Sequence, residues 1–510
     1  MVVPSRSGRT NRLRIMVRGL LLWFLGLCVA AYLAVTSAWY LVLNQRDTNY
    51  VTWMDCILAP VRWDAIRHKR GEAYIDEGLV ALKARRWSEA VLKIRAGLAR
   101  APNQWRGRQN LGLFYLAAGQ RGRGLDLLKA GFEKTYPGRD AMELVIRAAL
   151  SGEDYDVAIE VLDWSLAGTS TAAERDHEWL VDQKCRVLMA QKRYGDVLAW
   201  IDAQALMTEI RHESKVVSLI ELGRFAEART ALAEWGQGSG VLGGVRRLTV
   251  RLAREEGDLE LMREVLMEMR ERSPLEPQAW VFTVVQEHMA GQTEAAEAAL
   301  KDYLIRFDSK AADIVIIARP LRQIEAWDLY DQLLLHAEER GLGGEALLRL
   351  KIEASMDRSA WAEADRLMET YVEEVKNLDQ KQTSWLTLNR LLMDHLQRGD
   401  DSTREILLKT LQAYPYEVGF LKGVAVRLEE NDRQDGALAV WELAHRRYPG
   451  SVHVSKAVAR LRDVVGKDAE PEFEIPLIED GVELQMDDLF APREELPSNI
   501  VVALQSARRF

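Results

Sequence analysis

Residues 223–235 read GRFAEARTALAEW, residues 257–269 read GDLELMREVLMEM and residues 291–303 read GQTEAAEAALKDY. These stretches begin 34 residues apart, and the period continues to residue 368 in two series of positions. One series is Phe225, Leu259, Thr293, Trp327 and Trp361, and the other, apolar throughout, is Leu232, Leu266, Leu300, Leu334 and Met368. A fixed period of this size is typical of stacked helical repeats, in which each repeat packs only on its neighbours. The sequence therefore predicts an all-α solenoid of antiparallel helical hairpins.

A more specific pattern lies nearer the N-terminus. Residues 111–115, Leu-Gly-Leu-Phe-Tyr, resemble the L-G-x-x-Y core of the tetratricopeptide repeat, whose full pattern adds A-x-x-x-F and a closing proline. The preceding unit, Arg70 to Pro102, has Gly78 and Ala90 placed 34 residues before Gly112 and Gly124. The resemblance implies a right-handed superhelical solenoid over residues 70–462, in about eleven units. It also implies a concave groove, lined by the first helix of each unit, that binds other proteins.

A shorter signature extends through the later units. An aromatic residue begins the second helix and a small residue follows three positions on: Trp87 and Ala90, Tyr155 and Ala158, Phe225 and Ala228, Trp361 and Ala364, with Tyr194 and Val197 as a weaker copy. Glycines are expected at the turns between helices, because a left-handed cap favours them: Gly223, Gly257 and Gly291, with Gly399 and Asn431 in two final units. Tyr330 and Thr293 depart from the pattern. The spacing also stretches between Tyr155 and Tyr194 and again after Trp361, where we expect different packing or longer loops.

The N-terminal region predicts a single membrane-spanning helix over residues 19–43. Gly19 to Leu43 contains no charged residue, and 25 residues of helix span about 37 Å, enough to cross a bilayer. A cleaved signal peptide is the alternative, with Thr36-Ser37-Ala38 as its site, although the apolar run continues past it. Residues 1–18 contain five arginines and no acidic residue, so the N-terminus is expected in the cytoplasm and the repeats outside it. We expect a bacterial inner membrane, with the repeats in the periplasm.

Two further segments flank the repeats. Residues 44–69 form an aromatic-rich connector with Pro60 in its middle, expected to include a short helix on the membrane surface. Residues 463–510 form an acidic tail, with eleven acidic residues against one arginine between Asp468 and Glu495. Four prolines interrupt any helix in this tail, which we expect to be disordered and solvated. Its apolar clusters offer an alternative, in which it docks on a partner or on the solenoid.

The remaining chemistry argues against an enzyme. The formal net charge is −9, and no basic domain predicts nucleic-acid binding. The three cysteines form no Cys-x-x-Cys pair, so burial of Cys56 and Cys185 as free thiols is favoured over a disulfide. Residues 238–243 formally match G-x-G-x-x-G, but a repeat helix is expected before them where a dinucleotide site needs a strand. We predict no catalytic residue, cofactor or metal.

The 34-residue register also aligns a set of basic side chains. Arg254, His288 and Arg322 occupy one slot in three successive units, and Arg251 and Arg319 share another slot three residues earlier. Arg247 lies on the same helix face as Arg251 and Arg254. One hypothesis is a basic track in the groove that binds an acidic or C-terminal carboxylate segment through charge-assisted hydrogen bonds. The protein's own acidic tail is a conceivable occupant. The alternative is that these side chains pair with Glu255, Glu256 or Glu287 and are merely solvated.

These observations favour a membrane-anchored scaffold or adaptor for other proteins, with no catalytic activity of its own. An alternative is a non-catalytic accessory subunit of an envelope enzyme or of a polysaccharide synthesis or export machine. A third possibility is an enzyme whose catalytic domain lies within the degenerate units, which a cluster of polar, pKa-shifted residues in a deep pocket would favour.

Overall fold

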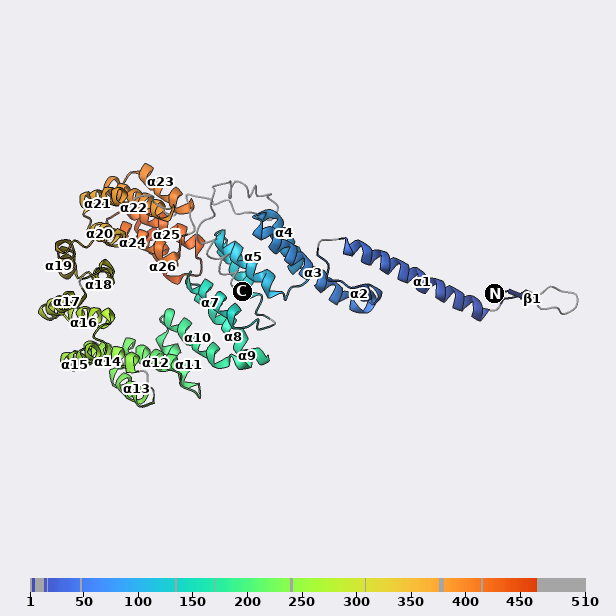
Figure 1. The fold of residues 1–510 in the computed structure, drawn as a ribbon, viewed down its shortest axis with the longest axis horizontal. Coiled ribbons are helices and arrows are strands. Elements are labelled where there is room, and N and C mark those ends of the chain that lie inside the picture. Colours follow the sequence, from blue (N-terminus) through green and yellow to red (C-terminus); the bar gives the residue numbers. More distant parts are fainter. Residues whose placement is uncertain are drawn as a thin grey trace. The chain divides into compact units, whose positions relative to one another are not determined.

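The computed structural model of the protein describes residues 2–4, 13–15, 17–45, 48–133, 135–168, 170–238, 242–307, 309–375, 380–413 and 416–465. These residues fall into two compact units, one up to Val145 and the other from Ile146 onward. Helices dominate both units, as the 34-residue period predicts (Figure 1).

The first unit contains two short strands, a long N-terminal helix and the first hairpins. The strands pair antiparallel, with Val2 opposite Ile15, and add a small sheet to the otherwise helical chain. The elements of this unit are β1 (Val2–Pro4), β2 (Leu13–Ile15), α1 (Val17–Asn44), α2 (Trp53–Ile57), α3 (Ala59–Lys83), α4 (Trp87–Leu98), α5 (Trp105–Ala117), α6 (Arg121–Lys129) and the first part of α7 (Arg139–Leu150).

The second unit continues the series of hairpins to residue 465. Its helices are α8 (Tyr155–Ala167), α9 (Thr171–Arg175), α10 (His177–Ala190), α11 (Tyr194–Asp202), α12 (Glu209–Glu221), α13 (Phe225–Gly238), α14 (Leu242–Glu256), α15 (Leu259–Arg272), α16 (Pro277–Met289), α17 (Thr293–Phe307), α18 (Ala311–Gln323), α19 (Trp327–Glu339), α20 (Glu345–Asp357), α21 (Trp361–Glu374), α22 (Gln380–Arg398), α23 (Asp401–Ala413), α24 (Val418–Glu430), α25 (Gln434–Arg447) and α26 (Val452–Val465). The fold is therefore a solenoid of tetratricopeptide-like hairpins.

A residue in the left-handed region closes every hairpin from α3/α4 to α24/α25. These residues are Arg85, Gly119, Glu153, Lys192, Gly223, Gly257, Gly291, Glu325, Ser359, Gly399 and Asp432. The turn at Gly223 shows the mechanism: its N–H donates to the Ile220 carbonyl, and the Arg224 N–H donates to the Leu219 carbonyl. This pair of bonds is the Schellman motif, which satisfies the last free carbonyls of a helix. The predicted turns at Gly223, Gly257, Gly291 and Gly399 are confirmed, and the last turn lies at Asp432, one residue beyond the predicted Asn431.

The two breaks in the 34-residue spacing have visible causes. Between Tyr155 and Tyr194 the short helix α9 is inserted before α10, which displaces the next turn. After Trp361 the first helix of the next hairpin, α22, is 19 residues long, whereas α20 has 13. Both breaks lie where the sequence predicts irregular packing.

Small residues allow the two helices of a hairpin to approach closely. Ala90, Ala158 and Ala364 are completely buried at the predicted small slots. At Gly97 a methyl group would lie 2.6 Å from the Ile75 side chain and 2.7 Å from the Gly71 carbonyl, so only glycine fits between α3 and α4. Tyr330 takes the small slot in α19 because its hydroxyl reaches out of the hairpin and donates to the Leu350 carbonyl at 3.0 Å.

The turn of α7/α8 is bonded to the last helices of the second unit. The Glu153 carboxylate accepts a hydrogen bond from Lys422 Nζ at 2.6 Å and another from the buried Ser451 hydroxyl. Burial raises the pKa of Glu153, but these two bonds together with the positive charge of Lys422 lower it below its usual value. The first and last hairpins of this unit are thereby joined through one ionised side chain.

The connector between α1 and the repeats contains the start of the first repeat helix. We expected residues 44–69 to precede the first repeat, but α3 begins at Ala59 and runs through residue 69 into the first hairpin. Pro60 does not interrupt this helix because it lies in the first turn, where a missing N–H costs nothing. A kink at Arg62 (φ −112°, ψ 23°) separates the first turn from the rest.

Candidate protein-binding surface

The first helices of successive hairpins lie next to one another in the second unit. Helix α12 packs beside α14, α16 beside α18, and α18 beside α20. Figure 1 shows α14, α16, α18 and α20 on the inner side of this unit, with their partners α15, α17, α19 and α21 on the outer side. The inner side is where a groove for partners was predicted.

The predicted basic residues lie on three successive first helices. Arg247, Arg251 and Arg254 are on α14, His288 is on α16, and Arg319 and Arg322 are on α18. Arg254, His288 and Arg322 each fall in the last turn of their helix. The 34-residue period thus places Arg254, His288 and Arg322 at equivalent positions on successive first helices.

Three of these arginines hold the stack of first helices together. Arg254 Nη1 donates to Gln286 Oε1 on α16 at 2.8 Å, and its Nη2 pairs with Glu255 at 2.5 Å. Similarly, Arg322 Nε donates to Asp357 Oδ2 on α20 at 2.6 Å, while its Nη1 pairs with Glu353. Arg251 pairs with Glu221 on α12. Each therefore bonds to a neighbouring first helix. Its guanidinium group already has hydrogen-bond acceptors within the protein.

The other three residues remain accessible. Arg247 and Arg319 are exposed and His288 is half-buried, and none of the three makes a side-chain ion pair or hydrogen bond within the part of the chain that the structure describes. Met289, beside His288, is 49% exposed and lies against Arg254, whose Nη1 is 3.2 Å from its sulfur. The basic residues that the sequence predicts to form one track therefore fall into two groups. Arg251, Arg254 and Arg322 bind neighbouring first helices, whereas Arg247 and Arg319 are exposed and make no side-chain bond with the described residues.

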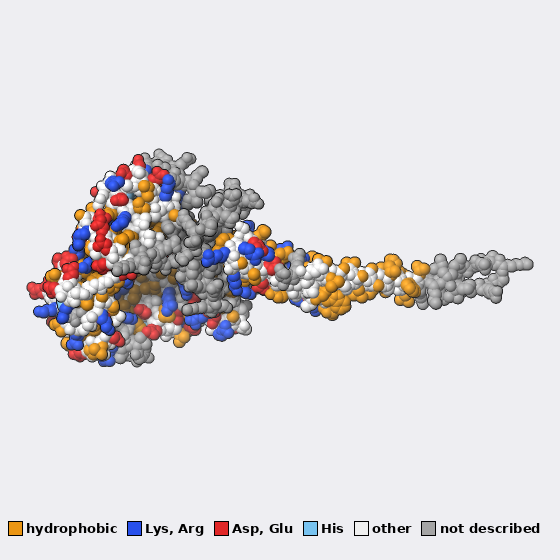
Figure 2. All heavy atoms as spheres, turned by 45° about the horizontal axis from the view of Figure 1, so that its top comes forward, with side chains coloured by type: hydrophobic (Ala, Val, Ile, Leu, Met, Phe, Trp, Pro, Cys, Tyr) orange, Lys and Arg blue, Asp and Glu red, His pale blue; other side chains and the backbone are white. Residues whose placement is uncertain are grey.

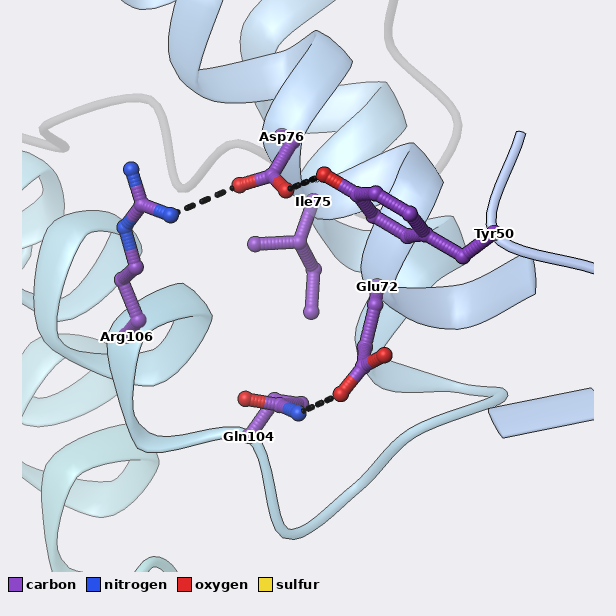
Figure 3. Close-up of a pocket in the computed structure, with 6 residues that line it drawn as sticks. All are labelled: Tyr50, Glu72, Ile75, Asp76, Gln104 and Arg106. Carbon is purple, nitrogen blue, oxygen red and sulfur yellow. Dashed lines mark hydrogen bonds and ion pairs between the residues drawn. The ribbon is translucent and has the colours of Figure 1, made fainter. Parts of the chain in front are cut away.

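A pocket lies in the first unit, between α3, α5 and the segment before α2. It is an open pocket of about 240 Å³ lined by Tyr50, Glu72, Ile75, Asp76, Gln104 and Arg106. As Figure 3 shows, Asp76 accepts hydrogen bonds from the Tyr50 hydroxyl at 2.6 Å and from Arg106 Nη1 at 2.9 Å, and Gln104 donates to Glu72. The bond to Asp76 raises the pKa of Tyr50, because it favours the protonated phenol.

This pocket was missed by the sequence reasoning. Glu72 and Asp76 share a face of α3 by their spacing of four residues, which is a weak signal on a charged helix. Their partner Tyr50 comes from the connector, and no periodicity relates that segment to the repeats. Hydrogen bonds among its polar groups connect the segment before α2 to the first two hairpins.

The structure bears on the other chemical motifs as well. Helix α13 ends at Gly238, the first of the glycine-rich residues 238–243, so a helix stands where a dinucleotide site requires a strand. In the described residues no group of three or more His, Cys, Asp or Glu side chains is arranged to hold a metal ion. Cys56 and Cys185 are buried free thiols, as predicted, and burial raises the pKa of Cys185 to about 11.

Comparisons with known proteins give only a general likeness. No protein-family model matches the chain, and no curated protein is significantly similar to it in sequence. Among solved structures, it is similar to the structure of Naa15/Naa10 bound to HypK-THB, with 12% identity and a TM-score of 0.33 over 85% of this chain and 66% of that one. The chain thus spans slightly less than two thirds of that protein's length.

Two other solved structures show a comparable likeness. The APC/C hetero-tetramer Cut9-Hcn1 has 11% identity and a TM-score of 0.27, over 80% of this chain and 89% of that one. Yeast Tom70 also has 11% identity, with a TM-score of 0.28 over 87% of this chain and 96% of that one. At these values no family is identified, and the fold is assigned from the hairpins themselves.

Proposed function

We propose that this protein is a membrane-anchored scaffold that binds other proteins through the first helices of its second unit and catalyses no reaction of its own. The observation that carries the proposal is that some of the basic side chains bond to neighbouring helices and others on the same helices do not. Arg251, Arg254 and Arg322 bond α14 to α12, α14 to α16 and α18 to α20, whereas Arg247 and Arg319 extend from α14 and α18 with no ion pair or hydrogen bond to the described residues. Stacked repeats present extended surfaces of this kind for binding.

The ligand that suits this surface is an extended segment with acidic groups. Guanidinium groups form their strongest hydrogen bonds with carboxylates, often in pairs. The exposed Met289 beside them provides a flexible apolar contact of the kind found at adaptable binding surfaces. An acidic or C-terminal peptide segment of another envelope protein would satisfy both. The acidic tail of the chain itself lies outside the described residues beyond 465, and we retain it as a competing occupant.

The anchor in this proposal is helix α1. It contains an apolar stretch of 25 residues, Leu20–Asn44, long and apolar enough to cross a membrane and exposed along most of its length. A signal sequence would satisfy the same criteria. We propose an uncleaved anchor with a cytoplasmic N-terminus, because the five preceding arginines favour that side, and repeats in the periplasm of a bacterial cell. Protease protection in sealed inverted vesicles tests this orientation, since cytoplasmic repeats would be digested.

A photo-crosslinking experiment in intact membranes tests the binding surface. A photoreactive amino acid replaces Met289 or Arg319 on the inner side, and Ile305 on the outer helix α17 provides the control, since it is 72% exposed. The same partner should be captured from the two inner positions and not from Ile305. Capture of this partner from Ile305 alone would overturn the proposed surface.

Charge reversal then tests the role of the free arginines. Arg247→Glu and Arg319→Glu, made singly, should each reduce capture, while Lys301→Glu, an equal change at an exposed site on α17, should leave it unchanged. Because Arg254 and Arg322 stabilise the stack, their reversal would not separate binding from folding. Deletion of residues 466–510 should raise capture if the tail competes for the surface. The identity of the captured protein separates a general scaffold from an accessory subunit of an envelope enzyme.

A further inference from the structure

The connector between α1 and the repeats folds back along α1 instead of leading away from it. The Trp53 indole N–H donates to the Ser37 hydroxyl at 3.0 Å, and the Tyr32 hydroxyl donates to the Ile57 carbonyl at 2.7 Å. Tyr32 lies 12 residues before the end of α1, which corresponds to about 18 Å of helix. The end of α2 therefore lies level with the middle of α1.

Helix α3 then returns along the same side. The rings of Trp63 and Trp39 stack with centroids 6.1 Å apart, and Ile66 packs with Leu43 near the end of α1. The chain thus forms a helical hairpin beside the C-terminal half of α1, with its tip at residues 57–61. This tip reads Ile-Leu-Ala-Pro-Val and contains no charged or polar side chain. It is the part of the hairpin closest to the N-terminal half of the apolar helix.

The outer face of this hairpin is unusually apolar. Val61 is 86% exposed, Trp63 58%, Met54 54% and Trp53 44%. Figure 2 shows hydrophobic side chains continuing from the long helix onto its junction with the rest of the first unit. Tryptophan favours the boundary between hydrocarbon and water, because its large ring is apolar and its N–H is polar.

The charge that lies behind the tip, Asp55, is neutralised within the hairpin, whereas the exposed Asp64 and Arg67 follow the tip on α3. The buried Asp55 carboxylate receives Lys69 Nζ at 2.6 Å, lies 3.6 Å from Arg62 Nη1 and accepts the backbone N–H of Thr52 at 2.9 Å. Lys69 is the main cause of the low pKa of Asp55, which stays ionised and paired. Internal pairing of charges is what a segment in contact with lipid requires, since unpaired charges there are costly.

We propose that the tip at residues 57–61 and the flanking Trp53 and Trp63 insert into the membrane leaflet on the repeat side, beside the second half of α1. The anchor is then a three-helix unit, and the second half of α1 is sheathed by α2 and α3 where it leaves the hydrocarbon. The occupant of the apolar face is lipid, because the face is continuous with the exposed surface of α1. This inference rests on the proposed membrane anchor.

Spin labelling of the full-length protein in liposomes tests the insertion. A nitroxide on the native Cys28, whose side chain is exposed on α1, reports on the bilayer core, whereas Cys56 and Cys185 are buried. In a Cys28→Ser background, Val61→Cys places the label at the tip and Leu92→Cys places it on α4, at a site 71% exposed. Collision rates with apolar oxygen and with a water-soluble nickel chelate are measured at each site.

The proposal predicts that the ratio of oxygen to nickel collisions at Val61→Cys rises well above that at Leu92→Cys and approaches that at Cys28. A water-like ratio at Val61→Cys with a lipid-like ratio at Cys28 overturns the insertion and leaves the anchor intact. Water-like ratios at both sites overturn the anchor itself. An immobilised label at Val61→Cys that neither reagent reaches would show that protein, and not lipid, covers the tip.

Discussion

Replacing Arg211 on α12 should produce one of the largest losses of stability in the second unit. Its side chain is completely buried, and Nη2 pairs with Glu178 at 2.8 Å while Nη1 and Nη2 donate to the carbonyls of Leu206 and Glu178. Its Nε faces Asp182 Oδ1 at 2.8 Å, as an ion pair whose angle is poor for a hydrogen bond. One side chain therefore joins α10, α12 and the loop between α11 and α12.

The expected loss follows from what remains after Arg211→Met. Glu178 is half-exposed and returns to water, so that its pair contributes at most about 1 kcal/mol. The Asp182 side chain is only 10% exposed and would remain buried without its cation. Removing one partner of a buried pair costs roughly 3–5 kcal/mol, mostly because the other charge is left uncompensated. We therefore expect Arg211→Met to lower the free energy of unfolding by about that amount.

A second substitution identifies the source of the loss. Asp182→Asn removes the stranded charge and still lets the Thr208 hydroxyl donate to the side-chain oxygen. Added to Arg211→Met, it should recover roughly 2 kcal/mol, because a buried neutral amide costs less than a buried carboxylate. Arg186→Met on the exposed side of α10 is the control and should change stability by less than about 0.5 kcal/mol.

The measurement is urea unfolding of the full-length protein in detergent, followed by circular dichroism. The midpoint should fall at unchanged slope if stability alone has changed. A loss below about 1 kcal/mol for Arg211→Met would show that water reaches Asp182 in the folded state. A further loss on adding Asp182→Asn, in place of recovery, would refute the assignment of the cost to a buried charge.

Three further predictions concern other parts of the fold, and each is tested by unfolding in the same detergent. Glu325→Gly should raise stability by about 0.5–1 kcal/mol, because its φ of 54° strains a side chain by more than the entropy that glycine loses; an unchanged midpoint would contradict this. Gly97→Ala should cost roughly 1–3 kcal/mol by overpacking α3 against α4. Gly122→Ala, where nothing lies within 4 Å, should cost nothing. His395 is buried, which lowers its pKa, so the unfolded chain binds more protons and stability should fall as the pH drops below about 6.5; His395→Gln should flatten that dependence.

The sequence predicts the hairpins well because their contacts are local and periodic. The small slots at Ala90, Ala158 and Ala364 follow from the spacing alone, since the same two helices meet in each unit. The positions of the turns can be predicted only in part from the sequence. Gly223, Gly257 and Gly291 mark left-handed positions, but Arg85, Glu325 and Ser359 adopt the same backbone with no signal in their chemistry. There the Schellman hydrogen bonds of the turn impose the conformation on the residue that happens to occupy it.

The binding surface was harder to predict, because a periodic column of like charges has two physical outcomes. Repeats that align arginines also align the hydrogen-bond acceptors of the next unit. Arg254 bonds to Gln286, 32 residues later in the sequence, and Arg322 bonds to Asp357, 35 residues later. A period near 34 therefore favours bonds between repeats for any side chain long enough to reach across. Arg251, one turn before Arg254, also reaches an acceptor on a neighbouring first helix, Glu221, whereas Arg247 and Arg319 are exposed and make no ion pair or hydrogen bond with the described residues. In a solenoid of this kind, the side chains available to a partner are those that the period brings to the groove without also bringing their counter-ions.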